Sequence, residues 1–327
     1  MYRQHTITAF ALAALALTPT FAGAQSSNTA PARTAWGDPD LQGVWHSSGA
    51  VPMERPEEYQ DRATLTDEEA ARILAEAEER DRQALLAERR QTVAGGVVGA
   101  YNEFWMERGA PTNRTSMLVD PPNGRFPPLT PAGKLASTSR LRDDDHWEDR
   151  HIWERCVTRG GMPNAMFPRS YNNNMQVFQT PGWVAILHEQ IHETRLIPLG
   201  DRPEVSSNIG QWNGLARGHW EGDTLVVVTT NLDHRASALQ PWANFNSREG
   251  SGEKMSLVER FTRTGEGTLE YEIEVSDPLM YTGSWTVAYP FSQLHDPLYE
   301  YACHEGNYGM EGILTGGRAE DEEAATP

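Results

Sequence analysis

The clearest pattern along the chain is a strict alternation of apolar and charged residues between positions 268 and 275. Four apolar residues alternate there with three glutamates: Leu269, Tyr271, Ile273 and Val275 against Glu270, Glu272 and Glu274. Because successive side chains of a β-strand point to opposite faces, the alternation predicts a strand with one buried face and one solvated face.

Other short apolar runs extend this pattern into an antiparallel meander. The runs span residues 176–180, 183–188, 217–220, 224–230, 255–263, 284–290 and 299–303. Turn signals such as Pro181-Gly182 and Glu221-Gly222-Asp223 lie between them. Seven or eight short strands with tight turns predict a mainly β protein, an antiparallel β-barrel or sandwich of lipocalin-like size, over residues 169–318.

The preceding part of the chain has helical and irregular patterns instead. Thr66 and Glu69 form a capping box that predicts a helix from Asp67 to about Thr92, and its thin apolar stripe is typical of a surface helix. Residues 95–168 are rich in Pro, Gly and Arg and predict a long ordered loop. We therefore expect a helix-and-loop region, residues 35–168, packed on the barrel, and a disordered acidic tail at residues 319–327.

The N-terminus has the pattern of a secretory signal peptide. Arg3 supplies the positive charge, residues 9–17 form a short apolar core, and Ala22-Gly23-Ala24 offers a small-residue cleavage site. We expect residues 1–24 to be removed after Ala24, residues 25–34 to form a flexible leader, and the product to be periplasmic or secreted in a bacterium. No later apolar run reaches the roughly 18 residues of a membrane helix, so we expect no membrane insertion.

The net charge of −18 narrows the range of partners. Nucleic acids and anionic membranes are bound through clustered positive charge, which this composition disfavours. Ten Trp, ten Tyr and nine Phe provide aromatic surface for a core or for stacking on a ligand. We therefore expect a small-molecule ligand or substrate, and the sequence leaves the oligomeric state open.

Cys156 and Cys303 are the only two cysteines. In an oxidising compartment, two cysteines far apart in sequence are most simply a disulfide, and a free reactive thiol survives poorly there. We therefore predict a disulfide that joins the segments around the two residues.

The sharpest chemical motif is the run from His188 to His192, which matches the H-E-x-x-H zinc pattern. On a helix, both histidines would lie on one face roughly 6 Å apart and could share a metal ion, with Glu189 as general base. On a strand, four residues span about 13 Å and the imidazoles could not meet at one ion. The turn at Pro181-Gly182 and the alternation after His192 favour strands, and no third ligand stands out by its spacing.

A second group of polar and aromatic residues spans positions 299–308 around Cys303. These residues either hydrogen-bond their own loop or contribute to a site. In the second case we expect His304 and Glu305 to join the H-E-x-x-H run and Arg195 at one mouth of the barrel. A histidine with a carboxylate provides acid–base capacity, and an arginine can hold an oxyanion.

Several of these motifs together resemble a family of secreted bacterial proteins whose activity is uncharacterised. The resemblance rests on the opening W-G-D-P-D-L-Q-G-V-W at residues 36–45, E-R-C at 154–156, the H-E-x-x-H run, W-E-G-D-T at 220–224 and Y-A-C-H-E-G-N-Y at 301–308. It covers nearly the whole mature chain. It implies one integrated domain and assigns no activity to any residue.

Three functions fit these residues. The first is an extracytoplasmic lyase or hydrolase that acts on a small organic or sugar-like substrate by metal-independent His/Glu chemistry and needs no cofactor. Its candidate catalytic residues are His192, Glu189, Arg195, His304 and Glu305, and its candidate substrate-binding residues are His188, Tyr301, Asn307 and Trp220. The second is a zinc-dependent hydrolase with His188 and His192 as ligands. The third is a non-catalytic protein that binds a small ligand inside the barrel.

Overall fold

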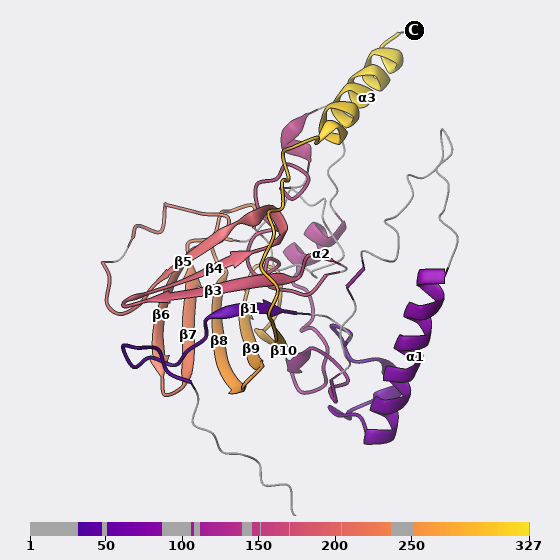
Figure 1. Ribbon diagram of the computed structural model, residues 1–327. Coiled ribbons are helices and arrows are strands. Elements are labelled where there is room, and N and C mark those ends of the chain that lie inside the picture. The colour runs from indigo at the N-terminus through magenta and orange to yellow at the C-terminus, as the bar shows by residue number, and fades with distance from the viewer. Residues whose placement is uncertain are drawn as a thin grey trace, which may run out of the picture. The chain divides into compact units, whose positions relative to one another are not determined.

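A computed structural model describes most of the chain after the leader (Figure 1). The described residues are 32–47, 51–86, 106–107, 112–138, 146–150, 152–169, 171–203, 205–236 and 252–326. The predicted signal peptide and residues 25–31 of the predicted leader lie outside them. No helix within these ranges has the length and apolar character needed to cross a membrane.

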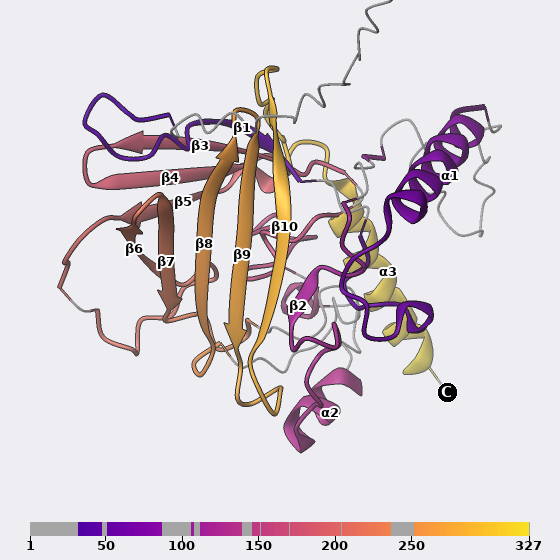
Figure 2. The same ribbon diagram turned by 90° about the horizontal axis from the view of Figure 1, so that it is seen from below.

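Ten antiparallel strands form one sheet, which confirms the predicted mainly β fold. The strands are β1 (Gly43–His46), β2 (Leu118–Asp120), β3 (Asn174–Thr180), β4 (Trp183–His188), β5 (Thr194–Pro198), β6 (Leu215–Glu221), β7 (Thr224–Thr230), β8 (Ser256–Gly265), β9 (Thr268–Ser276) and β10 (Trp285–Leu294). Their order is β5-β4-β3-β1-β10-β9-β8-β7-β6, and β2 also pairs with β10. In two views of the sheet, strands β3–β5 run across strands β6–β9 (Figures 1 and 2).

The two edge strands of the sheet meet without closing it. Leu199, directly after β5, forms a bridge to Gly218 of β6, and the Gly200 amide donates to the Gly218 carbonyl over 3.1 Å. A Cβ at position 218 would lie 2.7 Å from a side-chain carbon of Leu199 and 2.9 Å from one of Ile197. Only glycine therefore lets the edges approach this closely. The sheet is strongly curled and remains open.

The N-terminal region contributes to the sheet, contrary to the predicted division at residue 169. β1 lies in the middle of the sheet, where Val44 pairs with Gln176 of β3 on one side and Leu294 of β10 on the other. Four residues are too few for a period-two signal, which is why the sequence pattern did not predict this strand. Conversely, residues 299–303 were predicted as a closing strand, and they form none.

Three α-helices and three short 3-10 helices complete the described elements. They are η1 (Glu57–Tyr59), α1 (Asp67–Leu86), α2 (Pro131–Thr138), η3 (Trp147–Asp149), η4 (Gln190–His192) and α3 (Tyr308–Ala324). The capping box is confirmed, because the Glu69 amide donates to Thr66 Oγ1 over 3.2 Å and the Thr66 amide donates to Glu69 Oε2 over 2.9 Å. No side chain of α1 is buried, as expected for a surface helix. The predicted continuation of α1 beyond residue 86 lies outside the described residues.

The predicted disordered tail is wrong. Helix α3 extends through the acidic run to Ala324. Its Ala and Glu residues favour a helix locally, and charge density alone does not prevent one.

The predicted disulfide is confirmed, since Cys156 and Cys303 are bonded.

Large apolar and aromatic side chains fill the space between the two halves of the curled sheet. The alternating apolar residues of β9 are all fully buried, as predicted. Tyr271 lies at the centre of an aromatic group, with ring centroids 4.9 Å from Phe261, 5.3 Å from Tyr289 and 5.8 Å from Phe291. The aromatic residues of these strands therefore build a packed core, which disfavours the hypothesis that they line a ligand cavity inside the sheet.

Residues 158–167, here called the plug segment, add an irregular piece of chain to this core. Met162, Met166 and Phe167 are almost completely buried and belong to the same apolar cluster as the strands. The Tyr289 hydroxyl donates to the Met166 carbonyl over 2.6 Å. Because this contact satisfies a buried carbonyl without a strand partner, the loop can lie inside the protein at little cost.

The core also contains a buried ion pair, which corrects the expected position of Arg195. Arg195 was predicted at one mouth of the barrel, but it is 4% exposed and its guanidinium forms two hydrogen bonds, of 3.1 and 2.6 Å, with the buried Glu259 carboxylate. The Tyr271 hydroxyl donates to the same carboxylate over 3.0 Å. Burial is the largest influence and lowers the pKa of Arg195, but the charge and hydrogen bonds of Glu259, with smaller contributions from Tyr271 and Glu193, together raise that pKa above its ordinary value. This ion pair connects β5 with β8 across the core.

We expect Glu259→Gln to lower the free energy of unfolding by about 3–5 kcal/mol, because it leaves the Arg195 charge buried without its partner. Equilibrium unfolding in urea measures this value. Glu221→Gln is the matched control, because Glu221 forms an ion pair with Arg260 that is about half exposed and screened by solvent, so its loss should destabilise the protein far less. Equal losses in the two variants would contradict a role of Arg195–Glu259 in stability.

Candidate functional site

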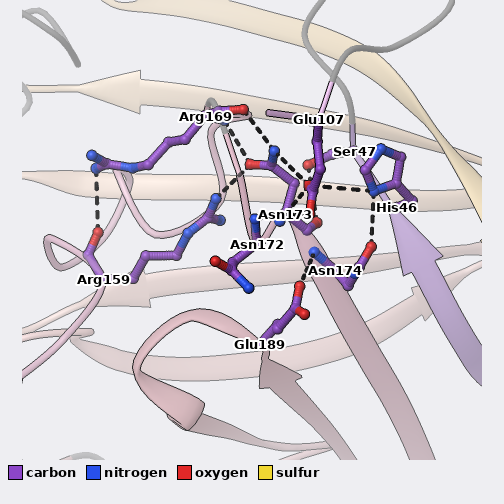
Figure 3. Close-up of polar contacts among 9 residues, drawn as sticks. All are labelled: His46, Ser47, Glu107, Arg159, Arg169, Asn172, Asn173, Asn174 and Glu189. Atoms are coloured by element: carbon purple, nitrogen blue, oxygen red, sulfur yellow. Dashed lines mark hydrogen bonds and ion pairs between the residues drawn. The ribbon is translucent and has the colours of Figure 1, made fainter. Parts of the chain in front are cut away.

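A polar cluster lies where β1 ends, β3 begins and β4 turns into η4 (Figure 3). It consists of His46, Ser47, Glu107, Arg159, Arg169, Asn172, Asn173, Asn174 and Glu189. β1 and β3 are neighbours in the sheet, and His46 is paired with Asn174 in their register. The antiparallel pairing therefore places a histidine and three consecutive asparagines at one end of the sheet.

His46 is held through one of its two ring nitrogens. Its Nδ1 lies 2.8 Å from the side-chain oxygen of Asn174 and 3.8 Å from Glu107 Oε2. An oxygen acceptor and a carboxylate beside the same nitrogen favour the tautomer with the proton on Nδ1. Nε2 is then the basic nitrogen, and among the described residues it has no hydrogen-bond partner. The His46 ring is half-buried.

Glu107 reaches this histidine from a distant part of the chain. Its carboxylate accepts hydrogen bonds from the backbone amides of Asn172 and Asn173, both at 2.9 Å, and from Asn173 Nδ2 at 3.0 Å. Asn172 has a φ of 53°, in the left-handed region that asparagine tolerates better than most residues. The turn thus presents two successive amides to one carboxylate and fixes its position.

A buried arginine, Arg159, contacts the asparagine turn from the core side. Arg159, in the plug segment, is 2% exposed and donates to the side-chain oxygens of Asn173 over 2.8 Å and Gln190 over 3.0 Å. It also donates to the Ala165 carbonyl over 2.6 Å. Burial lowers the pKa of Arg159, and it lowers the pKa of Arg169 to about 10 with a contribution from the Arg159 charge. These contacts connect the packed core to the asparagine turn.

The H-E-x-x-H run does not form the helix on which the zinc hypothesis depends. β4 ends at His188, η4 spans Gln190–His192, and Ile191 and His192 have φ values of 67° and 56°. Left-handed residues interrupt a right-handed helix, so the two histidines do not share a helical face. His188 is buried and His192 is exposed.

Within the run, only Glu189 belongs to the polar cluster. Its Oε2 accepts from the Asn174 amide over 3.3 Å, and its own amide donates to the Asn174 carbonyl over 2.9 Å. Asn174 therefore contacts His46 through its side chain and Glu189 through its backbone. His188 points into the core instead, where its Nε2 is buried and has no partner among the described residues.

The second predicted group lies beside the disulfide. Tyr301, Glu305 and Asn307 line a cleft of about 490 Å³ with Trp153, Cys156 and the beginning of α3. Asn307 Nδ2 donates to the Glu154 carbonyl over 3.2 Å. His304 is exposed, and neither it nor any of His188, Glu189, His192 and Arg195 lines this cleft. Trp220, on β6, packs partly against the apolar core.

The candidate residues were predicted to meet at one mouth of the barrel, and in the structure they lie in three separate places. Glu189 belongs to the polar cluster, His188 and Arg195 lie in the core, and Tyr301, Glu305 and Asn307 line the cleft beside the disulfide. Sequence reasoning missed His46, Glu107, Arg159 and the asparagine turn. The only available signals were the histidine directly after the W-G-D-P-D-L-Q-G-V-W opening and the unusual run of three asparagines.

Among the described residues, no group of three or more His, Cys, Asp and Glu side chains is placed to hold a metal ion. Comparison of the chain with protein-family models, with curated proteins and with solved structures finds no match.

We expect stability to fall as the pH drops below about 6.5, in part because of His188. Burial and the charges of Arg159 and Arg195 lower the pKa of His188 well below its ordinary value of 6.5. Above pH 6.5 both folded and unfolded states carry a neutral ring. Below it only the unfolded chain takes up a proton, and this contribution removes up to about 1.4 kcal/mol per pH unit.

The effect is measured by urea unfolding of the wild type and of His188→Gln. The measurements cover roughly pH 5 to 8, the range in which an ordinary histidine changes its charge. The variant should lose less stability on acidification than the wild type. His192→Gln, which alters an exposed ring, should keep the wild-type pH dependence. Identical slopes for the wild type and His188→Gln would contradict a neutral, buried His188.

Proposed function

We propose that this protein is an enzyme that uses His46 as a general base, with Glu107 and Glu189 as its carboxylate partners, on a small organic or sugar-like substrate. The observation that carries the proposal is the arrangement at His46 Nδ1, which leaves Nε2 as the basic nitrogen. A histidine oriented in this way by an acceptor on its other nitrogen is the usual form of a catalytic general base.

Glu107 supports this role electrostatically. Proton uptake at Nε2 makes the ring positively charged, and a carboxylate 3.8 Å from Nδ1 stabilises that charge. Three N–H donors hold the carboxylate in place. Because these donors belong to a turn that Arg159 anchors to the core, the charge is oriented before any substrate binds, which is the condition for effective electrostatic stabilisation.

Glu189 provides a second carboxylate near the base. It is half-buried, and the described contacts use one of its oxygens, Oε2, to accept from the Asn174 amide. A base and a second carboxyl group held by the same residue can serve as a proton acceptor and a proton donor for one substrate, a pairing that hydrolysis and β-elimination both use. The reaction class is therefore a hydrolase or a lyase.

We further propose that the enzyme acts outside the cytoplasm. The disulfide between Cys156 and Cys303 is compatible with an oxidising compartment, and the N-terminal pattern is that of a signal peptide.

The test is turnover of a panel of p-nitrophenyl esters, p-nitrophenyl glycosides and uronic-acid polysaccharides by the mature chain. We expect His46→Ala to lose about 100-fold or more in kcat with folding intact, the usual contribution of a general base. Glu107→Gln should lose less, because it removes only the charge beside the ring. His234→Ala alters an exposed histidine outside the cluster and should leave turnover unchanged.

Unchanged turnover in His46→Ala would contradict the proposal. If His192→Ala and His304→Ala lose turnover while His46→Ala stays active, the catalytic histidines are His192 and His304, as the sequence motifs predicted. The absence of turnover on the whole panel would count against a hydrolase or lyase.

A further inference from the structure

A second feature with the chemistry of a binding site is a groove of about 1120 Å³ on the outer side of β6 and β7. Arg217 and His219 of β6 line it together with Gly218, whereas Ala216 is buried and does not. Thr230 of β7 and Ser256 at the start of β8 line it as well. None of the residues of the His46 cluster does, so the groove is independent of the proposed catalytic site.

The described lining of the groove is more basic than the chain as a whole. Arg202, Arg217 and Lys254 outnumber the two acidic residues, Asp201 and Glu253. The whole protein has a net charge of −18, so the local sign is the reverse of the average. Such a local reversal concentrates anions at the groove.

The Arg217 guanidinium is held by two backbone carbonyls. Its Nη1 donates to the Ala216 carbonyl over 2.9 Å and its Nη2 to the Pro203 carbonyl over 3.4 Å. These two contacts connect the strand to the segment after β5. A guanidinium has five N–H donors, so a guanidinium held by two of them retains donors for an oxyanion.

Lys254 and Arg202 also line the groove. Lys254 is exposed, and the structure shows no carboxylate or carbonyl in contact with its ammonium among the residues that it describes. The Arg202 guanidinium lies 4.9 Å above the Trp183 ring, an arrangement that keeps its position without using a carboxylate. The groove thus combines a fixed arginine, a free ammonium and the hydroxyls of Thr230 and Ser256.

We propose that this groove binds the oxyanion of a small polar solute, a carboxylate or a phosphate, between Lys254 and Arg217. Charge-assisted hydrogen bonds from the two cations hold the oxyanion, and the hydroxyl side chains accept or donate to the rest of the solute. Citrate and inorganic phosphate are the probes, and glucose is the neutral control.

The experiment uses the fact that Lys254 and Lys134 are the only lysines in the chain. The mature protein is acetylated with an amine-selective reagent at constant ionic strength, with and without each probe, and the modified peptides are quantified by mass spectrometry. We expect saturating citrate or phosphate to slow acetylation of Lys254 at least about fivefold, as expected for an ammonium held by charge-assisted bonds. Lys134, exposed on α2, is the internal control and should react at an unchanged rate.

Titration calorimetry tests the same site through variants. Lys254→Gln should raise the Kd of the bound probe about tenfold or more, the usual effect of losing a hydrogen bond to a charged group. Lys134→Gln should leave the Kd unchanged. Because Lys254 is exposed, its replacement should not disturb the fold, and circular dichroism checks this.

The outcomes separate the alternatives. Protection by citrate alone identifies a carboxylate ligand, and protection by phosphate alone identifies a phosphate; both support the proposal. Equal protection of both lysines, protection by glucose, or no protection by either anion would overturn it.

Discussion

The polar end of the sheet depends on the buried cation of Arg159. A guanidinium inside a packed core is tolerated only when acceptors satisfy its donors. Arg159 finds them in the Ala165 carbonyl of its own segment and in the side chains of Gln190 and Asn173. Its own amide donates to Glu193 Oε1 over 3.0 Å. These contacts fix the plug segment, the turn after β4 and the beginning of β3 relative to one another.

A series of contacts leads from Arg159 to the other residues of the polar cluster. Asn173, held by Arg159, presents its amide groups to Glu107, and Glu107 in turn lies beside His46. Asn174 then contacts both His46 and Glu189. If His46 is the base that we propose, its position is already set by this chain of contacts with the core. The proposed chemistry is therefore a property of the packing beneath the cluster as much as of the residues in it.

The curled sheet keeps three chemically different places apart. One end carries the polar cluster, the interior is closed by aromatic rings and the Arg195–Glu259 pair, and the outer side of β6 and β7 forms the basic groove. Gly218 permits the approach of the two edge strands, since any side chain there would collide with Ile197 and Leu199. The disulfide adds a connection between residues 156 and 303 that no strand pairing supplies.

The sequence by itself determined the local elements of this protein. The alternation in β9, the turns between β3 and β4 and between β6 and β7, the capping box of α1 and the disulfide all follow from neighbouring residues or from composition, and the structure confirms them. Glu189 was identified as a candidate from its motif. Only the tertiary structure decided that His188 and Arg195 face the core, that β1 enters the middle of the sheet, and that His46, Glu107 and Asn174 meet. These contacts join distant residues, for example His46 and Asn174, which are 128 positions apart. The described contacts of Arg159 show why they form: burial of one charge requires acceptors from other segments, which no local pattern reveals.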